Sequence, residues 1–111
     1  NSGVYATKLA SQASLVARAG VDDAIFRIIM NPECGGTAVA SCPGTADPYL
    51  LTLNGSTAAI TILKDTPANG QTEITSLGNA GGKQHRIVAI VMTSSTAPLT
   101  TINTITDEIV P

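Results

Sequence analysis

The chain has 111 residues, a formal net charge of −2 at neutral pH, and charged side chains at only 13% of its positions. This length suffices for one modest hydrophobic core and no second domain. The weak charge argues against a nucleic-acid partner, because such a partner requires a basic surface that displaces counterions. No run of 18 apolar residues is present, so we expect no membrane span in this chain. A low-charge surface rich in Thr and Ser suits an extracellular or periplasmic protein.

The first predicted element is one unbroken helix from Val4 to Met30, which contains no proline and a single interior glycine, Gly20. At about 1.5 Å per residue, this helix would be about 40 Å long. A compact domain of this size has a radius of gyration of about 13 Å, so the helix either crosses the whole domain or projects from it. Because the helix also starts almost at the first residue, we expect the chain to be a subunit of a larger assembly.

Residues spaced three and four apart give this helix one continuous stripe, which is predicted to face the rest of the domain. The stripe consists of Ala6, Ala10, Ala13, Ala17, Val21, Ala24 and Ile28. Small side chains at most of these positions allow another backbone to approach closely. In the second half of the helix, larger side chains are predicted to fill space over a sheet: Val21, Ile25, Ile28 and Ile29.

The opposite side of the helix differs between its two halves. In the second half, Asp23 and Arg27 lie one turn apart in the favourable acid-first order, and we expect that side to be solvated. The first half carries a mostly apolar set there: Tyr5, Leu9, Gln12, Leu15 and Val16. Either the domain's own tail wraps these residues, or another chain packs on them. We favour another chain, because one four-stranded sheet cannot surround a helix, and we take these five residues as the predicted partner interface.

Pro32 ends the helix, and the loop that follows contains the only two cysteines, Cys34 and Cys42. Two glycines lie between them, so the loop can fold back and close a disulfide worth ~2–3 kcal/mol in the chain-entropy model. A disulfide implies an oxidising compartment. The alternative, a metal site, needs four ligands, and two thiols with the distant His85 cannot supply them. We therefore predict a disulfide, no metal site and no cofactor.

After the cysteine loop, the pattern changes from helical to strand-like. The predicted strands cover 49–53, 58–63, 72–77 and 83–93. Asn54-Gly55 is a strong hairpin signal between the first two, a loop over 64–71 precedes the third, and a Gly-rich turn over 78–82 precedes the fourth. In the Thr-rich tail, 99–105 could add an edge strand or pack irregularly. The predicted fold is one α+β domain, with the long N-terminal helix (4–30) packed on a four-stranded antiparallel sheet (49–93).

The sequence contains no constellation of residues typical of an enzyme. His85 is the only histidine, and it lies on a predicted strand beside Arg86. No serine lies in a G-x-S-x-G motif, and the adjacent Asp22 and Asp23 point about 100° apart on a helix. We expect the small basic group of Lys83, His85 and Arg86 to be a solvated rim. The chain is therefore predicted not to be an enzyme.

Three features together resemble the type IV pilin family. The first is the Ala-rich amphipathic helix with the segment Ala19-Gly20-Val21-Asp22-Asp23-Ala24-Ile25. The second is an apolar strand, with Ile60 and Ile62, followed by Glu73-Ile74-Thr75-Ser76-Leu77-Gly78. The third is a short Gly-rich turn that leads into Arg86-Ile87-Val88-Ala89-Ile90-Val91. This arrangement is similar to the central hairpin of pilins, minor pilins and secretion pseudopilins, and the resemblance covers most of residues 4–93.

The chain departs from pilins at its start and in its cysteines. Pilins begin with a processed Gly/Phe junction, an acidic residue at the fifth mature position and a long apolar segment that forms the filament core, and this sequence has none of these. Either that segment has been trimmed, or a short separate chain supplies it, as in the split pilins of metal-reducing bacteria, whose globular chain this sequence resembles. Cys34 and Cys42 lie between helix and sheet rather than in the family's usual C-terminal disulfide loop.

The resemblance implies a structural subunit of an extracellular, cell-surface filament that is exported through the periplasm. The helix would dock through the predicted partner interface onto an apolar core helix, and copies of the chain would repeat along a helical filament. One alternative is a minor pilin or type II secretion pseudopilin, which would bind a ligand or cargo at the filament tip through the 64–71 loop and the tail. A more distant alternative is a secreted binding module unrelated to filaments.

Overall fold

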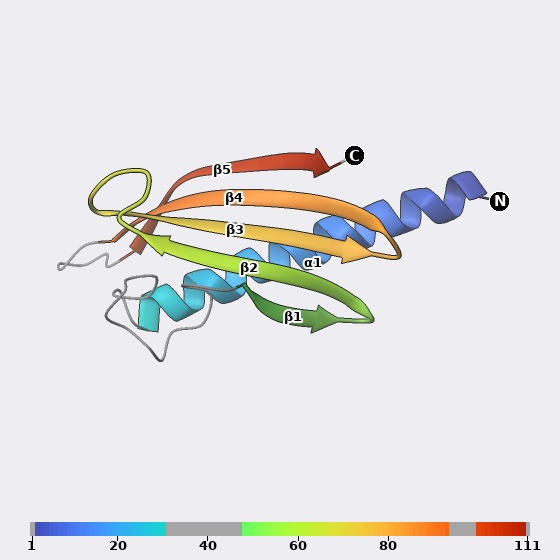
Figure 1. Ribbon diagram of the computed structural model, residues 1–111, viewed down its shortest axis with the longest axis horizontal. Helices are drawn as coiled ribbons and strands as arrows, with labels where there is room; N and C mark the ends of the chain where they lie inside the picture. Colours follow the sequence, from blue (N-terminus) through green and yellow to red (C-terminus); the bar gives the residue numbers. More distant parts are fainter. Residues whose placement is uncertain (1, 31–47, 94–99, 111) are drawn as a thin grey trace.

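The computed structural model describes residues 2–30, 48–93 and 100–110. One helix is followed by five strands: α1 (Ser2–Met30), β1 (Tyr49–Leu53), β2 (Ser56–Lys64), β3 (Gln71–Ala80), β4 (Lys83–Thr93) and β5 (Thr100–Val110). The strands form one antiparallel sheet in the order β1-β2-β3-β4-β5, and α1 crosses one face of it (Figure 1). The predicted α+β fold is confirmed. The predicted disulfide between Cys34 and Cys42 lies outside the described residues.

The sheet has five strands rather than the predicted four, because the tail pairs with β4. The register runs from Gln84↔Val110 to Thr93↔Thr100, with a shift between Ile90 and Val91. The isoleucines of this segment are spaced irregularly among Thr and Asn, so periodicity alone does not identify a strand. Pairing with β4 satisfies the backbone hydrogen-bonding groups of the segment, and this long-range contact decides its conformation.

The tight turns between strands are formed by residues with positive φ. Asn54 (φ 51°) and Gly55 (φ 81°) join β1 to β2, in agreement with the Asn-Gly signal. The predicted turn over 78–82 is too long, because β3 continues into it and only Gly81 (φ 57°) and Gly82 (φ 86°) turn the chain. Glycine is favoured in this left-handed region because it has no Cβ atom.

The backbone of α1 lies in direct contact with β3. A Cβ atom added to Gly78 would overlap the backbone carbonyl oxygen of Ala13, and one added to Gly20 would overlap the hydroxyl of Ser76. A residue larger than glycine at position 78 would therefore push the helix away from the sheet. The small residues on α1 serve, as predicted, to admit another backbone, and that backbone is the chain's own β3.

The hydrophobic core fills the space between α1 and the inner face of the sheet. It consists of Val16, Ala17, Val21, Ala24 and Ile28 from α1, and of Ala58, Ile60, Ile62, Ile74, Ile87, Ala89 and Val91 from β2–β4. Burial alternates along β2 and β3, because successive strand side chains point to opposite faces. Two positions predicted to face the sheet, Ala10 and Ile29, are exposed instead. Ile29 is rotated by about 100° from the buried Ile28, which carries it off the sheet.

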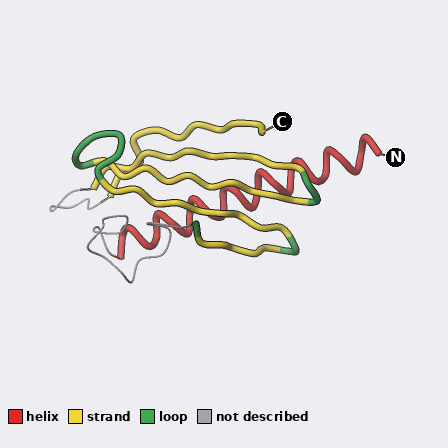
Figure 2. The backbone as a smooth tube through the Cα atoms, viewed as in Figure 1, coloured by secondary structure: helices red, strands yellow, loops and turns green. Residues whose placement is uncertain are grey.

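The helix both crosses the domain and projects from it. Figures 1 and 2 show α1 running obliquely behind the sheet, with its N-terminal turns beyond the turn between β3 and β4. The Leu9 side chain lies against that turn, since a Cβ atom added to Gly81 would be 2.9 Å from Leu9 Cδ1. Residues 2–8 therefore extend past this end of the sheet, and the molecule measures 52 × 25 × 21 Å.

Two hydroxyls on the inner face are buried without a hydrogen-bond partner among the described residues, Thr72 Oγ1 and Ser76 Oγ. An unpaired buried polar group costs about 1–3 kcal/mol. We expect Thr72→Val, which keeps the shape and removes the hydroxyl, to raise the free energy of unfolding by about 1 kcal/mol in urea denaturation. The control Thr61→Val, on the other face of β2, should change it by less than about 0.5 kcal/mol. An equal rise in both variants would contradict this explanation.

The contact between Gly78 and Ala13 gives a second prediction. Gly78→Ala should lower the free energy of unfolding by about 1–3 kcal/mol, because the obstructing atom is a backbone carbonyl that cannot rotate away. The control Gln71→Ala, at a half-buried position on the other face of the same strand, should cost less than about 0.5 kcal/mol. Urea denaturation of both variants measures the difference, and a harmless Gly78→Ala would show that the helix has room to move.

Candidate interaction surface

The side of α1 that faces away from the sheet carries four large, exposed apolar side chains. Leu15, Phe26, Ile29 and Met30 expose 60%, 61%, 47% and 70% of their surface. Leu15 and Phe26 are eleven residues apart, about three helical turns, so they share one side of the helix. We call these four residues the outer helix surface. Single exposed apolar residues are ordinary, but several on one helix side are typical of an interaction site.

The residues predicted to form the partner interface do not lie together. Leu15 belongs to the outer helix surface, Gln12 is half-buried, and Leu9 packs on the turn between β3 and β4. Val16 is 1% exposed and lies in the core, so the expectation that it faces away from the sheet is wrong. Tyr5 is part of α1, but its side chain lies outside the described part of the structure.

The error over Val16 has a simple physical cause. The helix rests on the sheet along a side that includes Gly20, the residue at the point of closest approach. That side is rotated from the predicted alanine stripe towards Leu9 and Val16. The predicted stripe does not include Gly20. Because Gly20 has no side chain, the sheet can contact the helix backbone at this position. Including the glycine in the stripe places the buried side more accurately.

Sequence reasoning misses three members of the outer helix surface. Phe26 lies between Asp23 and Arg27, whose charges suggest a solvated side. The spacing of eleven residues from Leu15 to Phe26, the chain's only phenylalanine, is the signal that places both on one side. Ile29 is predicted to face the sheet, and Met30 enters the prediction only as the last residue of the helix.

An exposed ion pair interrupts the outer helix surface. Arg18 Nε lies 4.0 Å from Asp22 Oδ1, and the two side chains are 53% and 69% exposed. A pair of this kind on a helix surface contributes only about 0.3–0.5 kcal/mol. The pair matters mainly because it places a carboxylate within the apolar surface, since Asp22 lies between Leu15 and Phe26 along the helix. A partner that covers both apolar side chains must leave this carboxylate solvated or offer it a donor.

The second helix pair, Asp23 with Arg27, is partly solvated, and it also links α1 to β1, which the sequence did not indicate. Arg27 Nε donates a hydrogen bond to Asp23 Oδ2 at 2.9 Å, and the Tyr49 hydroxyl donates to the same oxygen at 2.8 Å. The guanidinium carbon of Arg27 lies 4.8 Å from the centre of the Tyr49 ring. Because Tyr49 is 26 residues from Asp23 in sequence, local patterns could not indicate this contact.

The three groups of this network stabilise one another's ordinary charge states. Burial alone would raise the pKa of the Asp23 carboxyl, but the hydrogen bonds from Arg27 and Tyr49 outweigh it and hold this pKa below the usual 3.8. The hydrogen bond to Asp23 raises the pKa of Arg27. Burial, together with the hydrogen bond to the carboxylate, raises the pKa of Tyr49. Near neutral pH the network therefore holds one carboxylate, one guanidinium and one neutral phenol.

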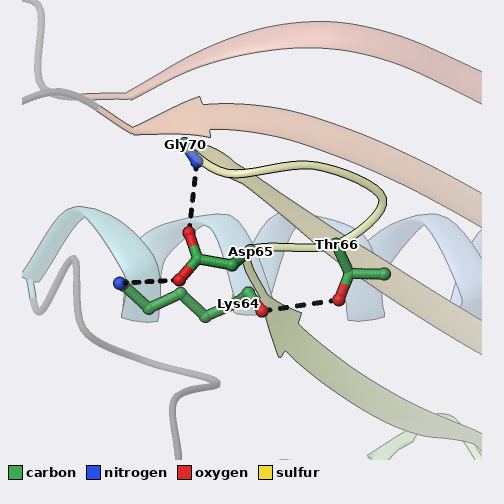
Figure 3. A network of polar contacts seen from close by, with 4 residues as sticks. All are labelled: Lys64, Asp65, Thr66 and Gly70. Atoms are coloured by element: carbon green, nitrogen blue, oxygen red, sulfur yellow. Dashed lines mark hydrogen bonds and ion pairs between the residues drawn. The ribbon is translucent and has the colours of Figure 1, made fainter.

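The β2–β3 loop is the element that a tip-binding subunit is predicted to use, and its polar groups bind one another. Gly70 N donates to Asp65 Oδ1 at 3.1 Å, Lys64 Nζ lies 3.4 Å from Asp65 Oδ2, and Thr66 Oγ1 donates to Lys64 O at 3.4 Å (Figure 3). The hydrogen bond from the Gly70 amide lowers the pKa of Asp65. In this loop, both oxygens of the Asp65 carboxylate already have partners within the loop, Gly70 and Lys64.

Chemical sites of other kinds are not found in the described part of the chain. Within 2–30, 48–93 and 100–110, no group of three or more His, Cys, Asp and Glu side chains could hold a metal ion. No helix in these ranges is long and apolar enough to cross a membrane. His85 is half-buried on β4, opposite Gly78 of β3, and takes part in an interaction within the chain.

Comparison of the chain with protein-family models, with curated proteins and with solved structures finds no match. The resemblance to type IV pilins therefore depends only on the sequence residues quoted for it.

The Asp23 network gives a testable pH dependence. Asp23→Asn should lower the free energy of unfolding by about 1 kcal/mol at neutral pH, because hydrogen bonds to an ionised group are lost on a partly solvated side. Since the pKa of Asp23 is lowered by folding, its contribution is present above the usual 3.8 and is lost as pH falls through the lowered value. Urea denaturation between about pH 6 and about pH 2 should show the difference from wild type shrinking in acid.

The control for this experiment is Asp22→Asn, which removes the more exposed helix pair and should cost less than about 0.5 kcal/mol at neutral pH. Tyr49→Phe should cost about 0.5–1.5 kcal/mol, because it removes one of the two hydrogen bonds to Asp23. The role of Asp23 would be contradicted if Asp23→Asn lowered the free energy of unfolding no more than Asp22→Asn does. It would also be contradicted if the effect of Asp23→Asn did not change with pH.

Proposed function

We propose that this protein is the globular subunit of an extracellular type IV pilus-like filament. It docks through the outer helix surface and the projecting start of α1 onto an apolar core helix, which is a separate chain or a segment joined to this one. The fold acts by polymerisation: α1 faces the filament core, and the sheet faces outwards. Copies of the chain repeat along the filament.

The observation that carries this proposal is the outer helix surface. Leu15, Phe26, Ile29 and Met30 expose large apolar side chains on the side of α1 that no described strand covers. Fully burying a large apolar side chain gains about 1.5–3 kcal/mol, and the half to two-thirds of each side chain that is still exposed would contribute a matching share. A groove between α-helices accepts side chains that recur at this helical spacing, so an apolar helix is a partner that matches the shape of the surface.

The projection of α1 also supports docking onto a core helix. Residues 2–8 extend past the turn between β3 and β4, so this end of the helix lies beyond the sheet (Figure 1). An isolated helix end gains little stability from its own hydrogen bonds, and most helical stability in proteins comes from packing. Contact with neighbouring helices of a filament core would supply that packing.

A subunit that repeats along the filament is favoured over a ligand-binding tip subunit. The β2–β3 loop, the main candidate for a tip site, has its Asp65 carboxylate engaged by Gly70 and Lys64. The outer helix surface, in contrast, is large, apolar and open. This difference favours assembly over ligand capture.

The test is filament assembly by Leu15→Asp and Phe26→Asp variants in the organism that carries the gene. Each places a charge where the partner helix should pack, so the yield of sheared filaments should fall at least about tenfold, the equivalent of ~1.4 kcal/mol. The stability of the purified chain should change by less than about 0.5 kcal/mol, because both positions are exposed.

Leu50→Asp is the matched control for this experiment. It alters an equally apolar side chain that is 71% exposed on β1, away from the outer helix surface, and should leave the filament yield unchanged. Normal filaments from both helix variants would overturn the proposal. A thinner or shorter filament population with equal loss in all three variants would also contradict it, because the effect would not depend on the helix surface.

A further inference from the structure

Two exposed turns of the chain contain the same dipeptide, Asn-Gly. Asn54-Gly55 joins β1 to β2, and Asn69-Gly70 lies in the β2–β3 loop. Asparagine is a chemically labile residue. When glycine follows it, the glycine amide nitrogen can reach the side-chain carbonyl carbon, and no side chain on the glycine hinders the attack. The dipeptide therefore marks two places where this chain can react with itself.

The reaction is a deamidation through a cyclic imide. The glycine amide nitrogen loses its proton to solvent and attacks the asparagine Cγ atom. A bond forms between these two atoms, and the Cγ–Nδ2 bond breaks as ammonia leaves. Water then opens the imide at one of its two carbonyl groups, which gives aspartate or isoaspartate. The net reaction consumes water and releases ammonia, and it needs no other reactant.

The two turns are alike in their access to solvent and in the space around the glycine. Asn54 and Asn69 are both exposed. Gly55 and Gly70 both have a φ of 81°, and no described atom lies within 4 Å of a Cβ atom built on either residue. Exposure and free space therefore do not distinguish the two sites.

The hydrogen bonding of the attacking nitrogen does distinguish them. Gly70 N donates a hydrogen bond to Asp65 Oδ1 at 3.1 Å (Figure 3), whereas the Gly55 amide has no hydrogen-bond partner within the described ranges. Asp65 is ionised at neutral pH, because the hydrogen bond from Gly70 lowers its pKa. A proton held by a carboxylate is harder to remove, since its loss would place two negative charges side by side.

The turn that contains Asn69 is also held by backbone hydrogen bonds. Thr66 N donates to Gln71 O at 3.0 Å, and Gln71 N donates to Ala68 O at 3.1 Å. These two bonds fix the backbone on both sides of the Asn69-Gly70 peptide. They therefore resist the rotation that brings the asparagine Cγ atom and the glycine nitrogen together.

The turn that contains Asn54 lies at the edge of the sheet. The strand before it, β1, has five residues and pairs with β2 alone among the described strands. Short edge elements with few packed neighbours open locally at a small free-energy cost. The Asn54-Gly55 peptide is therefore the freer of the two to reach the arrangement that the attack requires.

From this contrast, we propose that Asn54 is a self-modification site that deamidates to aspartate or isoaspartate, and that the hydrogen bond from Gly70 to Asp65 protects Asn69. The aspartate product keeps the turn, because Asp-Gly favours the same geometry. The isoaspartate product adds a carbon atom to the backbone, which breaks the tight turn and weakens the pairing of β1 with β2. This proposal is independent of the proposed function, because neither turn belongs to the outer helix surface.

The test compares both sites in one sample of the purified, folded chain. The chain is incubated in mildly alkaline buffer, digested with trypsin and analysed by mass spectrometry. Cleavage after Lys64 and Lys83 places Asn54 and Asn69 in different peptides, and fragment ions locate the modified residue. Asn54 should deamidate at least about tenfold faster than Asn69, the size of effect expected from a hydrogen bond to a charged group.

Two controls separate the folded structure from the chemistry of the dipeptide. In concentrated urea, the two sites should react at rates within about threefold of each other, because unfolding removes the hydrogen bond to Asp65. Asp65→Gly removes the carboxylate and tolerates the φ of 58° at this position. It should raise the rate at Asn69 at least about fivefold and leave the rate at Asn54 unchanged, with circular dichroism to show that the variant is folded.

Several results would overturn the proposal. They are equal rates at both sites in the folded chain, a faster reaction at Asn69, no product at Asn54, or an Asn69 rate that Asp65→Gly leaves unchanged. A difference between the sites that persists in urea would also overturn it, because the cause would then be local sequence. If Asp65→Gly did not fold, the comparison of folded and unfolded wild type would still decide the question.

Discussion

The contact between the backbone of α1 and the backbone of β3 sets the geometry of the whole molecule. Gly20 meets the Ser76 hydroxyl and Gly78 meets the Ala13 carbonyl, and neither glycine leaves room for a methyl group. Close-packed interiors tolerate such contacts only in one arrangement, since a small shift of the helix would create either an overlap or a void. The two glycines therefore determine the height of the helix above the sheet and its rotation about its own axis.

That rotation decides which side chains are available to a partner. It turns Val16 into the core and leaves Leu15 and Phe26 exposed on the far side. The Asp23–Arg27–Tyr49 network reinforces the same rotation near the end of the helix, because it anchors α1 to the edge strand β1. The apolar residues of the outer helix surface are thus held in place by contacts that they do not themselves make.

Because α1 covers one face of the sheet, the domain has two different surfaces on opposite sides. One is the outer helix surface, and the other is the sheet face turned away from α1. The outer helix surface is a ridge of large apolar side chains interrupted by the Arg18–Asp22 pair, a shape suited to the groove beside another helix. The face of the sheet turned away from α1 instead mixes threonines with apolar residues along β2–β4, and its Arg86 pairs in register with Glu108 of β5.

The elements of the fold could be predicted from local patterns, because Pro32, Asn54-Gly55 and the apolar runs act over a few residues. The strands at 49–53 and 83–93 and the end of the helix at Met30 are found where these signals place them. Two features depended on tertiary structure. The strand β5 forms because it pairs with the edge of β4. The exposed side of α1 depends on the contacts that Gly20 and Gly78 make between the helix and the sheet. Periodicity specifies that a helix has an apolar side, but the rotation of that side is set by the residues it packs against, and these are far away in sequence.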